Sequence, residues 1–296
     1  MIPRLNLQDG ITPVYLTFLE ALVGAGFTGD IESSYASRLA VATDNSVYQW
    51  VPQAVVFPRS TDDVIALTTL AREPRFAQVH FSARGGGTGT NGQALNDGLI
   101  VDLSRHMHGI LEFNADERWV RVQAGLVKDK LNEFLKPHGL FFSPELSTSN
   151  RATIGGMINT DASGQGSLVY GKTSAHVLAV TAVLDDGSLL QAHPVHGEAL
   201  AVKLADGGRE GAIYRQVLAS ARDKRAEVEA TFPKLNRFLT GYDLKHVYDP
   251  ASDGVDLSRL LCGSEGTLAF ITEAKLDLTP IPTFRTLVNV KYDSFE

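Results

Sequence analysis

The sequence predicts an α+β fold in which a small α/β part precedes a larger part built mainly from antiparallel strands. Three observations support this prediction. Up to about residue 103, short apolar runs typical of buried strands alternate with helical patterns. From about residue 110, alternating strand patterns and a hairpin turn signal prevail. Between the two, a glycine-dense loop at residues 85–92 directly follows a predicted strand of the first part.

The first part begins with a helix whose start is marked by Thr12 as N-cap and Pro13 at the first helical position. Apolar residues at helical spacing follow, and Gly24 and Gly26 end the pattern. A second helix is expected after Ser60, because a capping serine precedes acidic residues that favour the positive end of a helix. Three short apolar runs are predicted to be strands, at residues 54–57, 79–83 and 99–103.

The second part contains several predicted strands and two longer helical patterns. Residues 126–135 and 213–228 are expected to be helices. Residues 185–187 read Asp-Asp-Gly, a turn that joins two strands as a hairpin. The predicted strands lie at residues 110–113, 119–122, 177–184, 188–191, 267–272 and 274–278.

Composition excludes several classes of protein. The chain has 296 residues, of which 44% are hydrophobic, and a net charge of -7, so it lacks the basic surface of a nucleic-acid-binding protein. No apolar run approaches the ~18 residues of a membrane span, and the first residues do not resemble a signal peptide. A single cysteine, Cys262, rules out disulfides within the chain and a cysteine-ligated metal cluster. We therefore expect a protein without a membrane span that does not bind nucleic acid, and that is either cytoplasmic or attached to a membrane only through partners.

The glycine-dense loop decides which kind of phosphate-binding motif is present. Residues 87–92 fit the G-x-G-x-x-G pattern, but a Rossmann motif requires a helix directly afterwards. Here residues 96–98 are a turn signal and the strand at 99–103 follows; a P-loop is also excluded, because no Gly-Lys-Ser/Thr is present there. A strand–turn–strand loop with five glycines among residues 85–92 can instead surround a diphosphate with consecutive backbone N–H groups.

Four stretches in order resemble the FAD-linked oxidase family. They are RGGGTGTNG at 84–92, TIGGMINTDASG at 153–164, Tyr170-Gly171 with the strand and hairpin after it, and GSEGTLAFIT at 263–272; GYDL at 241–244 also matches. The resemblance covers about residues 50–282. It implies the PCMH-type FAD-binding fold shared by vanillyl-alcohol oxidase, glycolate oxidase and D-lactate dehydrogenases. That fold has a small α/β subdomain and a larger mixed or antiparallel sheet subdomain with helices.

Residues 144–174 are most similar to one subgroup of this family, the large bacterial D-2-hydroxyglutarate dehydrogenases. This similarity implies the FAD-binding portion of a flavoprotein dehydrogenase that oxidises a D-2-hydroxy acid by hydride transfer to flavin N5. A glycolate- or D-lactate-type dehydrogenase is the alternative among flavoenzymes. A binding module that keeps the flavin fold without redox activity is the alternative from another class.

The resemblance also implies four segments. Residues 1–48 would be an N-terminal helical extension, 49–108 the first FAD-binding subdomain, 109–282 the second, and 283–296 the start of a truncated substrate (cap) domain, with residues 286–292 as its first strand. In relatives the catalytic base and any metal ligands lie in the cap. We therefore expect the catalytic residues and an iron–sulfur part after Glu296, and no activity from this fragment alone.

Cofactor-binding roles follow from the matched motifs. Amides of residues 85–89 with Thr88 and Asn91 would hold the diphosphate, while Asn159 and Ser163 would bond flavin or phosphate oxygens. The Gly155-Gly156 pair either lets the backbone lie against the cofactor or begins a closely packed helix. Arg84 would contact a phosphate or pair with a carboxylate. The predicted cofactor-binding set is Arg84, Gly85, Gly86, Gly87, Thr88, Gly89, Thr90, Asn91, Gly92, Pro144, Glu145, Thr153, Gly155, Gly156, Asn159, Ser163, Gly164, Tyr170, Gly266 and Ile271.

Other reactive residues are assigned no role. His106 and His108 have a spacing that a metal could use, but we expect solvated loop histidines and no metal site. His176 lies beside the Tyr170 segment, and we expect FAD to be held non-covalently. Cys262 is expected to be a buried strand residue. The partner is expected to be a small 2-hydroxy acid, the electron acceptor stays open, and a homo-oligomer is compatible with the full-length protein.

Overall fold

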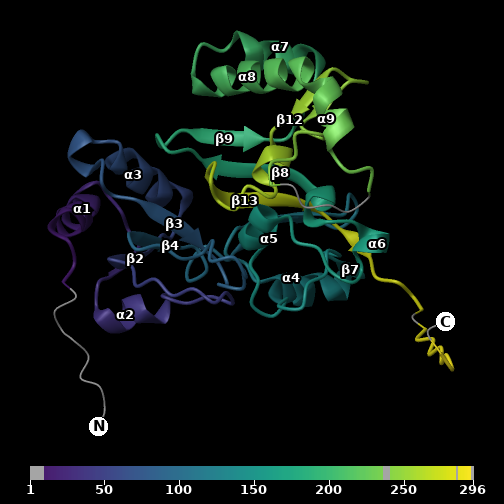
Figure 1. Ribbon diagram of the computed structural model, residues 1–296, viewed down its shortest axis with the longest axis horizontal. Helices are drawn as coiled ribbons and strands as arrows, with labels where there is room; N and C mark the ends of the chain where they lie inside the picture. The colour runs from purple at the N-terminus through teal and green to yellow at the C-terminus, as the bar shows by residue number, and fades with distance from the viewer. Residues whose placement is uncertain (1–9, 236–240, 285, 295–296) are drawn as a thin grey trace.

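The computed structural model describes residues 10–235, 241–284 and 286–294. Two sheets lie side by side in it, each with helices packed against it (Figure 1). One hydrophobic core runs through both halves, and Phe81 of the first half packs on Phe270 of the second with ring centroids 5.5 Å apart. The two halves are called the first and second subdomains below.

The first subdomain is a mainly parallel sheet with helices on both faces. Its strand order is β1-β2-β4-β3, with β1 alone antiparallel to its neighbour. Alternate side chains of a strand point to opposite faces, so Val56 and Val101 join the main core with α1 and α3, whereas Val55 and Ile100 pack with Val41 just after α2. The elements are α1 (Pro13–Gly24), β1 (Asp30–Glu32), α2 (Tyr35–Ala40), β2 (Ala54–Phe57), α3 (Thr61–Ala71), η1 (Pro74–Phe76), β3 (Phe81–Arg84) and β4 (Leu99–Asp102).

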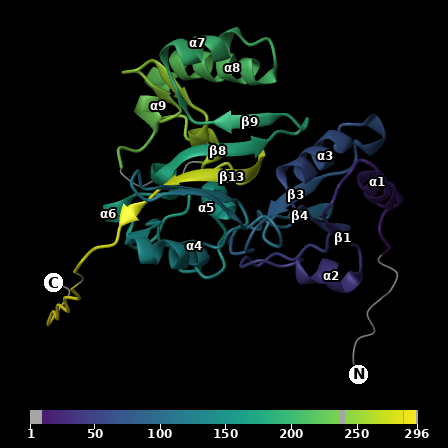
Figure 2. The same ribbon diagram turned by 180° about the vertical axis from the view of Figure 1, so that it is seen from behind.

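The second subdomain is built on an antiparallel sheet of order β5-β6-β13-β8-β9. In both views α4 and α5 lie on one side of this sheet and α7 and α8 on the other (Figures 1 and 2). Its central strands are β5 (Ile110–Asn114), β6 (Trp119–Gln123), β8 (Val177–Val183), β9 (Leu189–Ala192) and β13 (Phe270–Asp277).

Shorter elements complete the second subdomain. Two small antiparallel sheets, β10-β12-β11 and β14-β7, lie beside the main one. The helices are α4 (Lys128–Leu135), α5 (Ile154–Thr160), α6 (Ser167–Tyr170), α7 (Gly197–Ala205), α8 (Arg209–Asp223), α9 (Arg225–Thr231), α10 (Ser258–Leu261), η2 (Lys136–His138) and η3 (Thr173–His176). The remaining strands are β7 (Leu140–Phe141), β10 (Pro194–Val195), β11 (Tyr248–Asp249), β12 (Gly254–Asp256) and β14 (Thr279–Pro280).

The predicted α+β class is confirmed, and most predicted elements are present with shifted ends. Thr12 occupies the N-cap position of α1 but its side chain makes no capping bond, whereas Ser60 caps α3 by accepting from the N–H of Asp63. Three predictions were wrong. The helix expected over 213–228 is two helices, separated at Lys224. The two strands expected over 267–278 are the single strand β13 with a bulge between Ile271 and Glu273. Residues 286–292 form no strand.

The proposed segment boundaries remain predictions. Residues 1–9 of the expected extension lie outside the described residues, as do residues 285, 295 and 296 of the expected cap domain. Within the extension, β1 pairs with β2, so residues before 48 complete the sheet of the first subdomain. Cys262 is buried as expected, but it follows the short helix α10 rather than lying in a strand.

Candidate functional site

A cavity of about 290 Å³ lies between the two subdomains and collects most of the predicted site. Its wall in the first subdomain is the loop after β3, and its walls in the second are α5 with the turn after it, and the segment that leads into β13. The predicted residues that line it are Arg84, Gly85, Gly86, Gly87, Thr88, Gly89, Thr153, Gly155, Gly156, Asn159, Ser163, Gly266 and Ile271.

The glycine loop connects the parallel strands β3 and β4 and is pressed against the second subdomain. A Cβ added at Gly85 would lie 2.1 Å from the Thr153 Oγ1, and one at Gly86 would lie 2.1 Å from the Arg151 carbonyl oxygen. Gly87 and Gly92 have φ values of +60° and +78°, which side chains rarely allow. Contacts within the protein therefore require glycine at positions 85 and 86, and the backbone conformation favours it at positions 87 and 92.

A run of consecutive unclaimed amides in the cavity lies in this loop and not at the start of a helix. The backbone N–H groups of residues 86–90 donate to no acceptor among the described residues. By contrast, the first N–H groups of α5 are all taken: Ile154 donates to the Leu126 oxygen, Gly155 to the Ala124 oxygen and Gly156 to the Thr153 Oγ1. An anion in the cavity would thus find its backbone donors in the loop, as a nest of N–H groups provides.

The Arg84 side chain holds the glycine loop in place through hydrogen bonds to backbone oxygens. Its guanidinium donates to the backbone oxygens of Val41, Thr43 and Ala94, at 3.2, 2.8 and 3.4 Å. Burial lowers the pKa of Arg84, and the charge of Asp102 partly offsets this effect. The guanidinium holds three carbonyl groups rather than a carboxylate among the described residues, and thereby fixes the path of the loop. The predicted contact of Arg84 with a phosphate stays a prediction.

The Gly155-Gly156 pair lies in the first turn of α5, so the closely packed helix start is what the structure contains. A Cβ at Gly155 would meet the Ala124 Cβ at 2.8 Å, whereas one at Gly156 would approach only the Thr153 Oγ1, at 3.3 Å. Gly155 is therefore explained by packing against Ala124. Gly156 is the member of the pair whose missing side chain leaves room on the cavity side.

Asn159 joins α5 to the turn before β13. Its Oδ1 accepts from the Gly266 N–H at 3.1 Å and from the Ser264 Oγ at 3.3 Å, while its Nδ2 donates to the Gly155 oxygen at 2.9 Å. The predicted bond from Asn159 to a flavin or phosphate oxygen would compete with these contacts. The contacts of Asn159 in this structure therefore join α5 to the turn before β13, which are two walls of the cavity.

Seven predicted residues do not line the cavity. Asn91 and Gly92 border a separate groove beside Tyr48 and Trp50. Pro144 is buried, and Glu145 is exposed with its Oε2 accepting from the Gly166 N–H. The remaining three are Thr90, which is exposed, Gly164, which packs against the Glu145 oxygen, and Tyr170, whose ring packs on Phe141.

The structure adds polar residues that motif matching missed. Gln93 and Glu265 line the cavity from opposite subdomains, and Asp161 ends α5 with φ +50°. The Asp161 carboxylate lies 2.5 Å from the Lys172 ammonium; the Asp161 side chain is buried and that of Lys172 is 12% exposed. Asp161 and Lys172 lie within stretches already matched, but only the fold shows that they pair.

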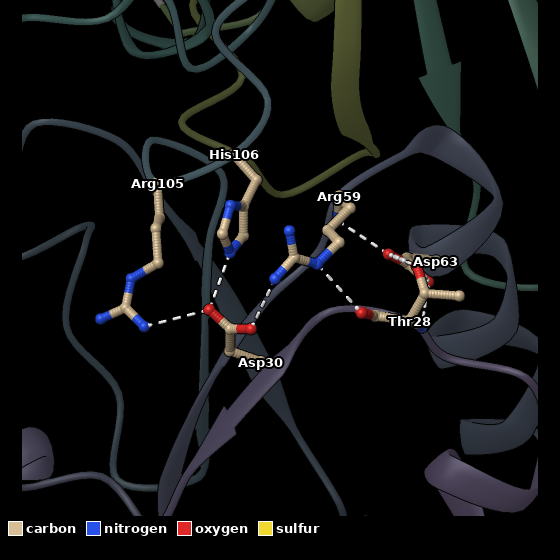
Figure 3. Close-up of polar contacts among 6 residues, drawn as sticks. All are labelled: Thr28, Asp30, Arg59, Asp63, Arg105 and His106. Atoms are coloured by element: carbon tan, nitrogen blue, oxygen red, sulfur yellow. Dashed lines mark hydrogen bonds and ion pairs between the residues drawn. The ribbon is translucent and has the colours of Figure 1, made fainter.

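The His-x-His segment differs from its prediction (Figure 3). His106 is not a solvated histidine: its side chain is only 21% exposed, and its Nε2 lies 2.8 Å from Asp30, which Arg59 and Arg105 also contact. His108 is exposed. Within residues 10–235, 241–284 and 286–294, no three His, Cys, Asp or Glu side chains gather as ligands for a metal ion.

Two further observations bear on the reactive residues and on membranes. The His176 Nε2 donates to the Tyr170 oxygen at 2.6 Å, and His176 is not among the residues that line the cavity. None of the helices that the structure describes combines the length and apolar character needed to cross a membrane.

Comparison with known proteins agrees with this geometry. The chain is 61% identical over its whole length to D-2-hydroxyglutarate dehydrogenase of Pantoea ananatis and 58% identical to that of Escherichia coli, and it spans 29% of the length of each. Glycolate oxidase subunit GlcD of Bacillus subtilis is 28% identical over 94% of the chain, which covers 48% of that protein.

Solved structures and a family model complete the comparison. A structure of alkyldihydroxyacetonephosphate synthase superposes with a TM-score of 0.66 at 18% identity, covering 96% of this chain and 44% of that one, which establishes the shared fold. Residues 52–193 match the model of a family described as FAD binding domain. The resemblance to FAD-linked oxidases is thereby confirmed, because residues 52–193 are similar to the FAD binding domain that this model describes.

Proposed function

We propose that this chain is the FAD-binding part of a flavoprotein dehydrogenase that oxidises a D-2-hydroxy acid, with D-2-hydroxyglutarate as the substrate. The observation that carries the proposal is the convergence of the glycine loop, α5 and the segment before β13 on one cavity, in a chain 54–61% identical to three D-2-hydroxyglutarate dehydrogenases. Identity to the glycolate and D-lactate enzymes is 26–30%, which favours the first substrate over these alternatives.

The cavity residues suit a dinucleotide. Unclaimed N–H groups of residues 86–90 and the Thr88 hydroxyl would donate to diphosphate oxygens, with Arg84 holding the loop in shape. The apolar side chains of Met157 and Ile271 line the same cavity and would keep water from a planar ring. When bound, FAD would supply the hydride acceptor, whereas this chain supplies binding and orientation.

The rest of the proposed reaction needs groups outside this chain. A base must take the hydroxyl proton and a cation must hold the substrate carboxylate. We propose that both lie in the part of the relatives that this chain does not span, together with the iron–sulfur part. We also propose non-covalent FAD, since His176 bonds Tyr170 outside the cavity lining. A cytoplasmic location and a homo-oligomer in the longer protein complete the proposal.

Flavin binding can be tested on the chain itself. We expect the purified protein, mixed with FAD, to show the shifted absorbance bands of bound flavin and to release unmodified FAD on heating. A chain that folds but takes up no FAD would contradict the proposal.

Substrate choice is tested in the longer protein by bleaching of the bound flavin without oxygen. We expect D-2-hydroxyglutarate to bleach it faster than glycolate or D-lactate. Faster bleaching by glycolate or D-lactate would favour that enzyme type. A bound flavin that none of the three acids reduces would favour a module without redox activity.

A further inference from the structure

Among the described residues two carboxylates line the cavity, and their surroundings differ. Asp161 lies 2.5 Å from the Lys172 ammonium, so its charge is balanced within the protein. Glu265 is half-buried, and no lysine, arginine or histidine of the described residues lies within ion-pair distance of it. Burial raises the pKa of Glu265, because the charged form loses hydration. A carboxylate in such a place needs hydrogen-bond donors around it.

The backbone at Glu265 adopts a conformation that disfavours a side chain. Its φ is +53°, in the left-handed region, and the neighbouring Gly263 and Gly266 have φ values of +86° and +78°. Glycine adopts such a conformation freely, whereas a residue with a Cβ is strained in it. Glycine at position 265 would therefore suit this turn at least as well, which points to a use of the side chain itself.

Glu265 lies at the C-terminal end of α5, away from the end that the glycine loop contacts. Its N–H donates to the Asn159 oxygen at 2.8 Å, and its Oε2 accepts from the Thr160 Oγ1 at 3.3 Å. The glycine loop packs on Thr153, the N-cap of the same helix. A helix rises about 1.5 Å per residue, so these two ends lie about 10 Å apart. A diphosphate bound by the loop near Thr153 would leave Glu265 beside an adjoining part of the dinucleotide.

We propose that the Glu265 carboxylate binds a hydroxyl group of the dinucleotide, on the ribose or on the ribityl chain, next to the diphosphate that the loop amides would hold. The inference rests on the proposed function, since it names a contact of FAD in the same cavity. The ribose and the ribityl chain flank the diphosphate of FAD, and their hydroxyl groups are donors. A carboxylate offers about four acceptor positions, so the long bond from Thr160 leaves capacity for a ligand. A hydroxyl bond to a charged acceptor is a strong one.

The test compares the affinities of three nucleotides for the parent chain and for Glu265→Ala, by isothermal titration calorimetry. FAD should bind Glu265→Ala about tenfold more weakly, as expected for loss of one hydrogen bond to a charged group. ADP contains the ribose with a diphosphate, whereas FMN contains the ribityl chain. Weaker binding of ADP with unchanged FMN would identify the ribose, and the reverse would identify the ribityl chain. If neither ADP nor FMN binds measurably, the FAD result decides.

Two results would overturn the contact while leaving FAD binding intact. A carboxylate that faces the diphosphate would repel it, so equal or tighter binding of FAD by Glu265→Ala would count against a hydroxyl contact. Equal weakening of ADP and FMN would show a general change of the cavity instead. A parent chain that takes up no FAD would overturn the proposed function itself.

Two further variants act as controls. Glu20→Ala removes the same charge from an exposed position on α1 and should leave all three affinities unchanged. Glu265→Gly removes the side chain and the backbone strain together. Without FAD it should unfold at the same or a higher urea concentration than the parent, yet bind FAD as weakly as Glu265→Ala. A clear loss of stability in Glu265→Gly would mean that the side chain serves the fold, and would contradict the proposal.

Discussion

At the scale of single residues, contacts within the protein already require glycine at positions of the cavity wall, whether or not a ligand is bound. The carbonyl oxygen of Arg151 lies where the first side-chain atom of residue 86 would go. The sequence pattern predicted the loop and its neighbours correctly, since a run of glycines identifies free backbone and positive φ. It could not distinguish room for a cofactor from contact with another segment, because that contact joins residues 65 positions apart.

We expect Gly86→Ala to destabilise the protein by about 1–3 kcal/mol, the usual effect of overpacking against backbone. FAD affinity should fall as well, because the loop must move away from residues 151–153. Urea unfolding and FAD titration measure the two effects. Gly207→Ala is the matched control, since nothing lies within 4 Å of its added Cβ. Equal stability of the two variants would contradict the proposed contact.

The environment of the Asp30 carboxylate leads us to expect that the stability of the protein depends on pH (Figure 3). Its pKa is lowered from the ordinary 3.8 to about 2, chiefly by the hydrogen bond from His106. A lowered pKa in the folded state stabilises the fold above the unfolded value, and the benefit is lost as the pH falls from about 4 to about 2.

Asp30→Asn should therefore be less stable than the parent at pH 6, and the difference should shrink between pH 4 and pH 2. Denaturant unfolding across this range checks it, with Asp116→Asn on the exposed turn before β6 as control. A difference that stays constant down to pH 2 would contradict the role of Asp30.

At the scale of elements, α5 shows what sequence patterns leave out. The helix has seven residues, two of them glycines, so propensity alone argues against it. It forms because Thr153 caps it, and because Asp161 takes a left-handed conformation at its end. The Lys172–Asp161 pair and the bond from the Ser174 N–H to Asp161 then hold that end in place. Such tertiary support cannot be seen in the local sequence.

The buried pair gives a test of this support. Lys172→Met should destabilise the protein by about 3–5 kcal/mol, because it leaves the Asp161 carboxylate buried without its partner. Adding Asp161→Asn should recover part of that loss, which a double-mutant cycle measures. Lys130→Met, which breaks an exposed pair with Glu133, should cost under about 1 kcal/mol. Strictly additive losses for Lys172 and Asp161 would argue that the pair does not support α5.

At the scale of the whole molecule, the fold class and the positions of the main strands along the chain follow from periodicity, but the order of strands in the sheets and the arrangement of short elements do not. β1, β7, β10, β11 and β14 have two or three residues each, too few for any alternation to be recognised. Each of them is a strand because its backbone pairs with that of a neighbouring strand. The cavity itself was predicted through its motifs, while Gln93 and Glu265, which line it from different subdomains, required the three-dimensional arrangement.

The end of the chain is the part least attached to this arrangement. Residues 286–294 are exposed and without regular structure, and Phe284 is 89% exposed. We expect a chain ending at Thr283 to have a free energy of unfolding within about 0.5 kcal/mol of the parent, because the described residues that are removed, 284 and 286–294, are exposed. A chain ending at Asp277 should be clearly less stable, since it loses buried Leu278 and β14. Equal stability of the parent and the chain ending at Asp277 would contradict this description of the terminus.

The one sulfhydryl of the protein provides a built-in reporter. Cys262 is 1% exposed, and burial raises its pKa above the ordinary value, so the reactive thiolate is scarce in the native state. Alkylating reagents can modify it only after the surrounding helices and strands part. The rate of alkylation therefore measures how often the region around Cys262 opens locally. No label has to be introduced, and the sequence contains no second thiol that would react.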